Sequence, residues 1–247
     1  MEFTVRLSLL VAGVAVYYGW AIRALGQATR PAGRRLLTRL KFVSHFTADE
    51  LESLVSLMAA AVGQVLFIVV AFAITDGSLA QLAPDRWEPL LLLLGALLGV
   101  GEAALASFLG FLCLRAAQAR EGGDQDSRDW LATGRGGWIR FYLRTAEIAP
   151  APLLLAVTAF YVTVEETLFR GVLITFLSAE GAGFAVAVST IMFVTVQVFH
   201  MPSWRAAMFP ALGGLVVGVV HGVLFVTTGN LAPLIVAHLM MFLVLVW

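Results

Sequence analysis

The sequence predicts an all-α protein that crosses a lipid bilayer several times, and three observations lead to this fold class. Hydrophobic residues make up 60% of the 247 residues and charged residues only 13%, whereas soluble domains contain about 25% charged residues. The mean hydropathy is +0.90. The apolar runs are long and do not alternate with polar residues, which favours spanning helices over a β-barrel. We therefore expect a polytopic transmembrane helical bundle.

About seven segments are long enough to span a bilayer, because a span needs about 20 apolar residues. A basic amphipathic segment at residues 34–46 predicts one further helix lying on the inner membrane surface, with an ordinary cytosolic linker as the alternative. The predicted spans are residues 3–25, 51–75, 89–114, 149–178, 183–200, 206–228 and 231–247.

The distribution of basic residues predicts the orientation of the chain. The first apolar segment is too long for a signal peptide, and a basic cluster follows it, which indicates a cytoplasmic flank and an N-terminus outside. Arginine is used almost throughout, with Lys41 the only lysine, which is typical of a GC-rich bacterial genome. We expect an integral protein of a bacterial inner membrane, with N-terminal helices and cytoplasmic loops over residues 1–148 and a transmembrane core over residues 149–247. The basic cluster consists of Arg23, Arg30, Arg34, Arg35, Arg39 and Lys41.

Two bulk properties exclude other classes of protein. The formal net charge is zero, so the sequence gives no support for nucleic-acid binding. Cys113 is the single cysteine, which excludes an internal disulfide, and its apolar surroundings favour a small buried side chain.

Charged residues inside the fourth predicted span are the strongest functional signal. Glu165, Glu166 and Arg170 lie in an apolar run, where each charge costs roughly 2.5–3.5 kcal/mol at mid-membrane. Glu166 and Arg170 are four residues apart, so they share a helix face and can form an ion pair. Glu165 is turned about 100° away. One carboxylate is thus neutralised and the other is free to act.

Two histidines are placed to meet this segment. The turn at Gly181–Gly183 separates Glu165 from His200, and each lies about 26 Å from it along a helix. An antiparallel hairpin therefore brings the two side chains to the same depth. His238 lies in the last span, where counting places it nearer the outer face than Glu165.

Two further polar residues lie in apolar spans. Glu102 is near the middle of the third span, where a carboxylate is a functional candidate, a packing residue or a partner for the arginine. His221 is surrounded by Gly214, Gly218 and Gly222, small residues that allow close helix packing. We expect structural hydrogen bonding for His221.

Three chemistries fit one free carboxylate, two histidines and a Glu–Arg pair. A carboxylate and an imidazole can activate water for amide hydrolysis while a second histidine stabilises the oxyanion. Glu165, His200 and His238 can instead hold Zn²⁺, although the HExxH zinc signature is missing. The same groups can also relay protons in a transporter.

The motifs of the C-terminal part resemble the CPBP family, which includes the type II CAAX prenyl endopeptidases and bacteriocin-processing and immunity proteins. The resemblance covers about residues 149–247. It depends on Glu165-Glu166-x-x-x-Arg170-Gly, on His200 at the end of the next span, and on Gly214-x-x-x-Gly218 followed by Thr228-Gly-Asn-Leu-Ala-Pro-x-x-x-Ala-His238.

The resemblance implies an intramembrane, glutamic-type protease that needs no cofactor. It implies that Glu165 and His200 activate water. Glu166 and Arg170 would form a structural pair, and His238 would stabilise the oxyanion. The implied partners are a peptide or membrane-protein substrate and the lipid bilayer.

Two positions depart from the family pattern. Val196 stands where the second motif usually has Phe, which is a mild packing change. Phe242 stands where the third motif usually has Asn or Asp four residues after its histidine. Loss of one oxyanion donor can lower a rate by about 10²–10³. Either His221 or Glu102 substitutes, or the enzyme is slow, or the protein is a non-catalytic binding or maturation partner.

Overall fold

The computed structural model describes residues 2–39, 47–78, 88–121, 143, 147, 150–199 and 201–246. All regular elements within these residues are helices, which confirms the all-α prediction. The N-terminal elements are α1 (Phe3–Val16), η1 (Tyr17–Ala21), α2 (Ile22–Arg39), α3 (Ala48–Thr75) and α4 (Pro89–Glu121).

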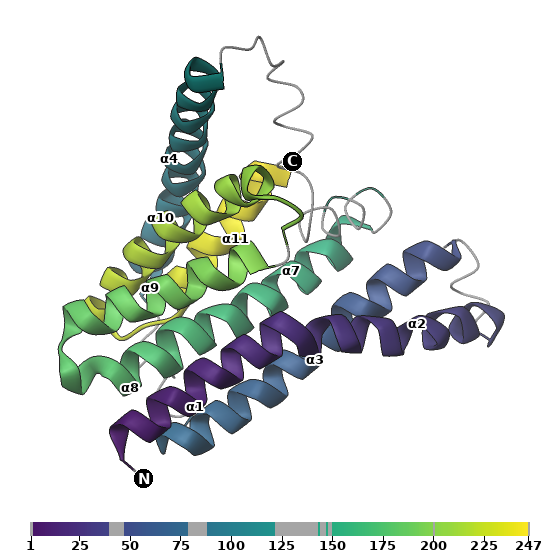
Figure 1. Ribbon diagram of the computed structural model, residues 1–247, viewed down its shortest axis with the longest axis horizontal. Helices are drawn as coiled ribbons and strands as arrows, with labels where there is room; N and C mark the ends of the chain where they lie inside the picture. Colours follow the sequence, from purple (N-terminus) through teal and green to yellow (C-terminus); the bar gives the residue numbers. More distant parts are fainter. Residues whose placement is uncertain are drawn as a thin grey trace.

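The C-terminal elements contain the residues singled out above. They are α7 (Ala151–Glu166), η4 (Thr167–Ile174), α8 (Thr175–Leu177), η5 (Ser178–Glu180), α9 (Ala182–Phe199), α10 (Trp204–Thr228) and α11 (Ala232–Val246). In Figure 1, α1, α3 and α7 lie side by side, and α4 stands at a steep angle to them beside α10 and α11.

Six helices in the described part of the chain are long and apolar enough to cross a membrane. Many of their large apolar side chains are exposed, as expected for helices surrounded by lipid. The seventh predicted span, residues 231–247, corresponds to the shorter apolar helix Ala232–Leu245, which follows a capped turn at residues 229–231. At 1.5 Å per residue its length is about 21 Å, less than the roughly 30 Å of a bilayer core.

The N-terminal helix is longer than predicted. α1, η1 and α2 follow one another without a break to Arg39, so residues 34–39 continue the first helix. Residues 34–39 are helical, as predicted, and residues 40–46 lie outside the described residues. The location of this helix on the inner membrane surface stays a prediction.

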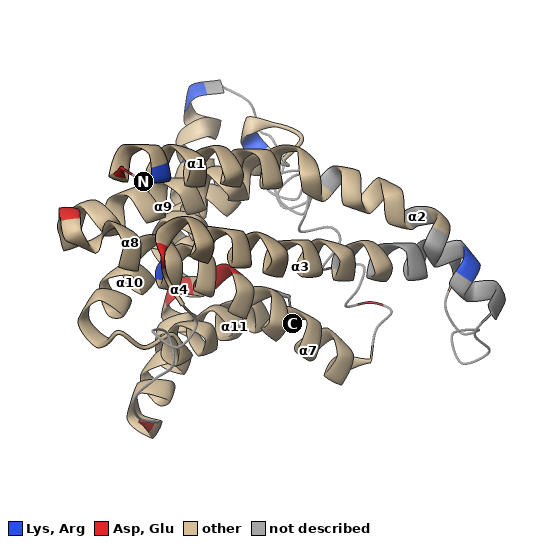
Figure 2. Ribbon diagram, turned by 90° about the horizontal axis from the view of Figure 1, so that it is seen from below, with Lys and Arg blue, Asp and Glu red and all other residues tan. Residues whose placement is uncertain are grey.

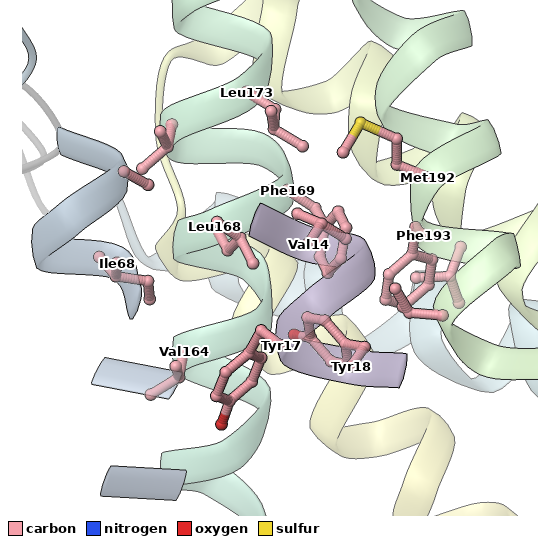
Figure 3. Packing of buried hydrophobic residues seen from close by; sticks show 14 of the residues in the cluster. Val14, Tyr17, Tyr18, Ile68, Val164, Leu168, Phe169, Leu173, Met192 and Phe193 are labelled. Atoms are coloured by element: carbon pink, nitrogen blue, oxygen red, sulfur yellow. The ribbon is translucent and has the colours of Figure 1, made fainter. Parts of the chain in front are cut away.

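Two π-helical segments, η1 and η4, meet in the core. Tyr18 of η1 lies 6.1 Å from Phe169 of η4, and Phe169 lies 5.1 Å from Phe193 of α9, measured between ring centroids. Figure 3 shows these rings packed together in the interior. Such π-segments are often found at functional sites, and here η4 begins directly after Glu166.

Glycines allow two helix pairs to pack with their backbones close together. A Cβ at Gly95 or Gly99 of α4 would overlap a carbonyl oxygen of α11. A Cβ at Gly218 of α10 would lie 2.5 Å from Thr190 of α9, and one at Gly222 would lie 2.8 Å from Val186. The prediction of close packing around these α10 glycines is confirmed.

Glycines also form the predicted turns. Gly181 has a φ of 110°, a value that favours glycine, and α9 begins at the next residue. Gly229, with a φ of 64°, ends α10. The side chain of Asn230 then accepts a hydrogen bond of 2.9 Å from the backbone N–H of Ala232, which caps α11.

The contact between α4 and α11 can be tested with two glycines of the same helix. We expect Gly99→Ala to destabilise the protein by about 1–3 kcal/mol, because its methyl group overlaps the backbone of α11. Gly101→Ala is the matched control, since nothing lies within 4 Å of its Cβ position and alanine favours the helix. Thermal unfolding in detergent should show a lower Tm only for Gly99→Ala; equal Tm values would contradict this packing.

Candidate active site

Charged and imidazole side chains are gathered inside the bundle, where they are almost fully buried. Figure 2 shows acidic and basic positions near α4 and α11 in the middle of the view, while further charged positions lie toward the ends of the helices. The buried members of this cluster are Glu102 of α4, Glu165 and Glu166 of α7, Arg170 of η4, His221 of α10 and His238 of α11.

The predicted ion pair between Glu166 and Arg170 is present. The Nε atom of Arg170 lies 3.4 Å from Oε2 of Glu166, and both side chains are fully buried. The guanidinium also donates a hydrogen bond of 3.1 Å to the carbonyl of Val217, and its carbon lies 4.3 Å from the ring centroid of Phe193. Carboxylate, carbonyl and aromatic ring together compensate for the loss of water around the arginine.

The other oxygen of Glu166 faces two imidazoles. Its Oε1 atom lies 2.7 Å from Nδ1 of His238 and 3.1 Å from Nδ1 of His221. His238 is thus level with the end of α7, although counting along the chain predicted a position nearer the outer face. The cause is the position of the turn at Gly229. Along a helix, His238 is roughly 14 Å from this turn, whereas Glu166 is roughly 22 Å from the turn at Gly181. Because His238 and Glu166 are level, the turn at Gly229 lies closer to the cluster than the turn at Gly181 does.

Glu102 extends the cluster to a fourth helix. Nε2 of His221 lies 3.1 Å from Oε1 and 3.3 Å from Oε2 of Glu102. The expected structural hydrogen bonding of His221 is confirmed, and Glu102 contacts this histidine rather than the arginine. The sequence identified Glu102 as a functional candidate because it is a carboxylate near the middle of a span. No local pattern linked it to His221, which lies 119 positions away.

Glu165 differs from its neighbour. Its side chain is 5% exposed, and among the described residues it has no hydrogen-bond or ion-pair partner. It lies close enough to Tyr17, Tyr161 and Arg170 to interact with them electrostatically. The two adjacent carboxylates are therefore unequal, because three side chains hold Glu166 and none of the described residues holds Glu165.

The structure describes two of the three remaining motif positions, Phe242 and Val196, but not His200. His200 lies outside the described residues, so its pairing with Glu165 stays a prediction. Phe242 stacks on His238 with a centroid distance of 5.4 Å and an interplanar angle of 26°. It supports the imidazole by packing in the place where a polar group was expected. Val196 is buried in the apolar core, as a packing residue would be.

This arrangement supports acid–base chemistry. A carboxylate that receives a hydrogen bond from Nδ1 of an imidazole fixes the tautomer of the ring and leaves Nε2 for a second partner. His238 has that relation to Glu166. Glu165, one residue away and without a partner in the described part of the chain, offers a second carboxylate. Glu166, His221 and His238 also offer ligand atoms within 4.8 Å of one another, a set that shares only His238 with the predicted zinc ligands.

The sequence comparisons identify this part of the chain. Residues 147–244 match the family model described as Type II CAAX prenyl endopeptidase Rce1-like. The similarity to this family covers 98 of the 247 residues, and we call residues 147–244 the Rce1-like segment. The match confirms the resemblance predicted from the motifs, and together with the apolar helices it makes the chain an integral membrane protein. No curated protein and no solved structure matches the sequence. The Rce1-like segment contains every member of the buried cluster except Glu102.

The buried arginine of the Rce1-like segment provides a stability test. Arg170→Gln leaves the Glu166 carboxylate without its cation in a buried site, so we expect a loss of about 3–5 kcal/mol. For a chain of this size that corresponds to a fall in Tm of roughly 6–20 °C. Arg6→Gln is the control, because Arg6 pairs with the exposed Asp76 near the surface and should cost about 1 kcal/mol or less. Similar Tm values for both variants in detergent would show that the buried pair does not stabilise the fold.

Proposed function

We propose that the protein is an intramembrane endopeptidase that hydrolyses a peptide bond in a membrane-associated substrate. The family of residues 147–244 supports a protease. The single observation that carries the proposal is the unequal pair of carboxylates at the end of α7. Glu166 is engaged by Arg170 and two imidazoles, which leaves Glu165 as the group that can take a proton from water.

In the proposed reaction Glu165 is the general base. It removes a proton from a water molecule, whose oxygen attacks the carbonyl carbon of the scissile peptide bond. His238, protonated on both ring nitrogens, donates a hydrogen bond from Nδ1 to Glu166 and one from Nε2 to the oxyanion of the tetrahedral intermediate. The proton taken by Glu165 then passes to the leaving amine as the carbon–nitrogen bond breaks. His200 is proposed to orient Glu165, and no step requires a cofactor.

The proposed substrate is a peptide or membrane protein presented from the bilayer. A bacterial inner membrane with the N-terminus outside fits the basic flank after the first helix. The family description names prenyl endopeptidases, so a lipid-modified peptide is one candidate class. Cleavage of matched prenylated and unmodified peptides in proteoliposomes would distinguish an enzyme that requires the lipid from one that recognises only the peptide.

The role of Glu165 can be tested with a neutral variant. Glu165→Gln removes the proton acceptor while keeping the shape of the side chain, so we expect peptide cleavage to fall by about 10²–10⁴. Glu180→Gln, an exposed carboxylate in the η5 turn, should cleave like the wild type. Fragments of a membrane-peptide library would be measured by mass spectrometry; equal cleavage by wild type and Glu165→Gln would exclude this function.

The stacking of Phe242 on His238 favours a second candidate, a catalytically weak relative that binds or matures a partner. In this case the site lacks one polar group beside the oxyanion position. We expect Phe242→Asn to raise the cleavage rate, by up to about 10²–10³.

Phe242→Leu is the matched control, because it removes the ring that packs against His238 without adding a donor. It should not raise the rate. A rate for Phe242→Asn at or below that of Phe242→Leu would mean that the aromatic ring itself belongs to a working site.

A further inference from the structure

We propose that Glu102 and His221 are positioning residues, which hold Glu166 and, through it, the ring of His238. The four side chains come from α4, α10, α7 and α11 and form one continuous row of contacts. Neither Glu102 nor His221 is part of the family motifs described above. The effect of these two residues on rate rests on the proposed function, whereas the row of contacts does not.

Both ring nitrogens of His221 face a carboxylate. Nε2 lies 3.1 and 3.3 Å from the two oxygens of Glu102, and Nδ1 lies 3.1 Å from Oε1 of Glu166. A neutral imidazole has a lone pair on one nitrogen, which would repel the carboxylate oxygen that it faces. A ring protonated on both nitrogens attracts both carboxylates. His221 therefore bridges α4 and α7 as a cation.

The charges of the buried cluster agree with this bridge. Its three carboxylates carry negative charge inside an apolar bundle, where an uncompensated charge is costly. Among the described residues of the cluster, Arg170 and the doubly protonated His238 of the proposed reaction compensate for two of these charges. The third is compensated when His221 is an imidazolium as well.

Glu166 transmits the position of His221 to His238. Its Oε1 atom contacts both imidazoles, at 2.7 Å from Nδ1 of His238 and 3.1 Å from Nδ1 of His221. Its Oε2 atom lies 3.4 Å from Nε of Arg170. Because both oxygens have partners, rotation of the carboxylate would break at least one contact. The acceptor for Nδ1 of His238 is therefore fixed, and with it the direction in which Nε2 of that ring points.

The row of contacts gives His238 a polar support that its own helix does not supply through Phe242. The phenyl ring of Phe242 stacks on His238 with a centroid distance of 5.4 Å, but it has no N–H or O–H to donate. The ring of His221 lies 5.8 Å from that of His238 at an interplanar angle of 77°. Glu102 lies outside the Rce1-like segment. The N-terminal half of the chain thus contributes to the geometry of the site.

Kinetics of conservative variants test the positioning role. Glu102→Gln keeps the shape of the side chain but removes the charge that holds His221, so we expect kcat for peptide cleavage to fall about 10–100-fold with KM nearly unchanged. The double variant with His221→Gln should fall no further than His221→Gln alone, because Glu102 acts through His221. Glu102→Asp keeps the charge and should retain more activity than Glu102→Gln. Gly101→Ala is the matched control on the same helix, since nothing lies within 4 Å of its Cβ position, and it should cleave like the wild type.

Nuclear magnetic resonance of the histidine rings provides a second test that does not require cleavage. In protein labelled with ¹⁵N-histidine and kept in detergent, the signals of each ring would be assigned by their loss in His221→Gln and His238→Gln. We expect the nitrogen shifts of an imidazolium for His221 in the wild type. The signals of His238 should move in Glu102→Gln but not in Gly101→Ala.

The two tests separate the positioning role from the proposed function. A wild type that cleaves peptides while Glu102→Gln keeps its kcat would overturn the positioning role, as would unmoved His238 signals in Glu102→Gln or a neutral His221 in the wild type. A wild type that cleaves no peptide would refute the proposed function instead. In that case the His238 signals would still decide whether Glu102 acts on this ring.

Discussion

The carboxylate of Glu166 is the interaction on which the site depends. It lies fully buried between Arg170 on one oxygen and two imidazoles on the other. In an apolar bundle none of these groups is stable alone, because each would lack the hydration that it has in water. Their mutual compensation fixes η4, α10 and α11 around the end of α7, and it leaves Glu165 as the one carboxylate there without a partner among the described residues.

Backbone packing brings these groups together. Glycines at positions 95 and 99 let α4 contact the backbone of α11, and Gly218 does the same for α10 against α9. The consequence is that Glu102, far outside the family-matched segment, reaches His221. Small residues at these positions thus affect the site, because a bulkier side chain would overlap the neighbouring helix and push the two helices apart.

Phe242 illustrates how this chain differs from the motif pattern of the family that its C-terminal segment resembles. Where a polar group was expected, an aromatic ring stacks on His238 and restricts its orientation. The same histidine is held from another side by Glu166. The ring of His238 is therefore positioned by packing and by one carboxylate, while Glu102 and His221 add polar character that the family motifs alone did not place in the site.

The sequence by itself determined the all-α membrane fold, the Glu166–Arg170 pair and the family of the C-terminal part. These features follow from local composition, from helical spacing of four residues and from motif order, so no distant contact is needed to predict them. Only the tertiary structure decided that His221 and Glu102 join the cluster and that His238 is level with Glu166. Those outcomes depend on the depth of turns and on the packing of helices distant in sequence, which periodicity within one helix does not specify.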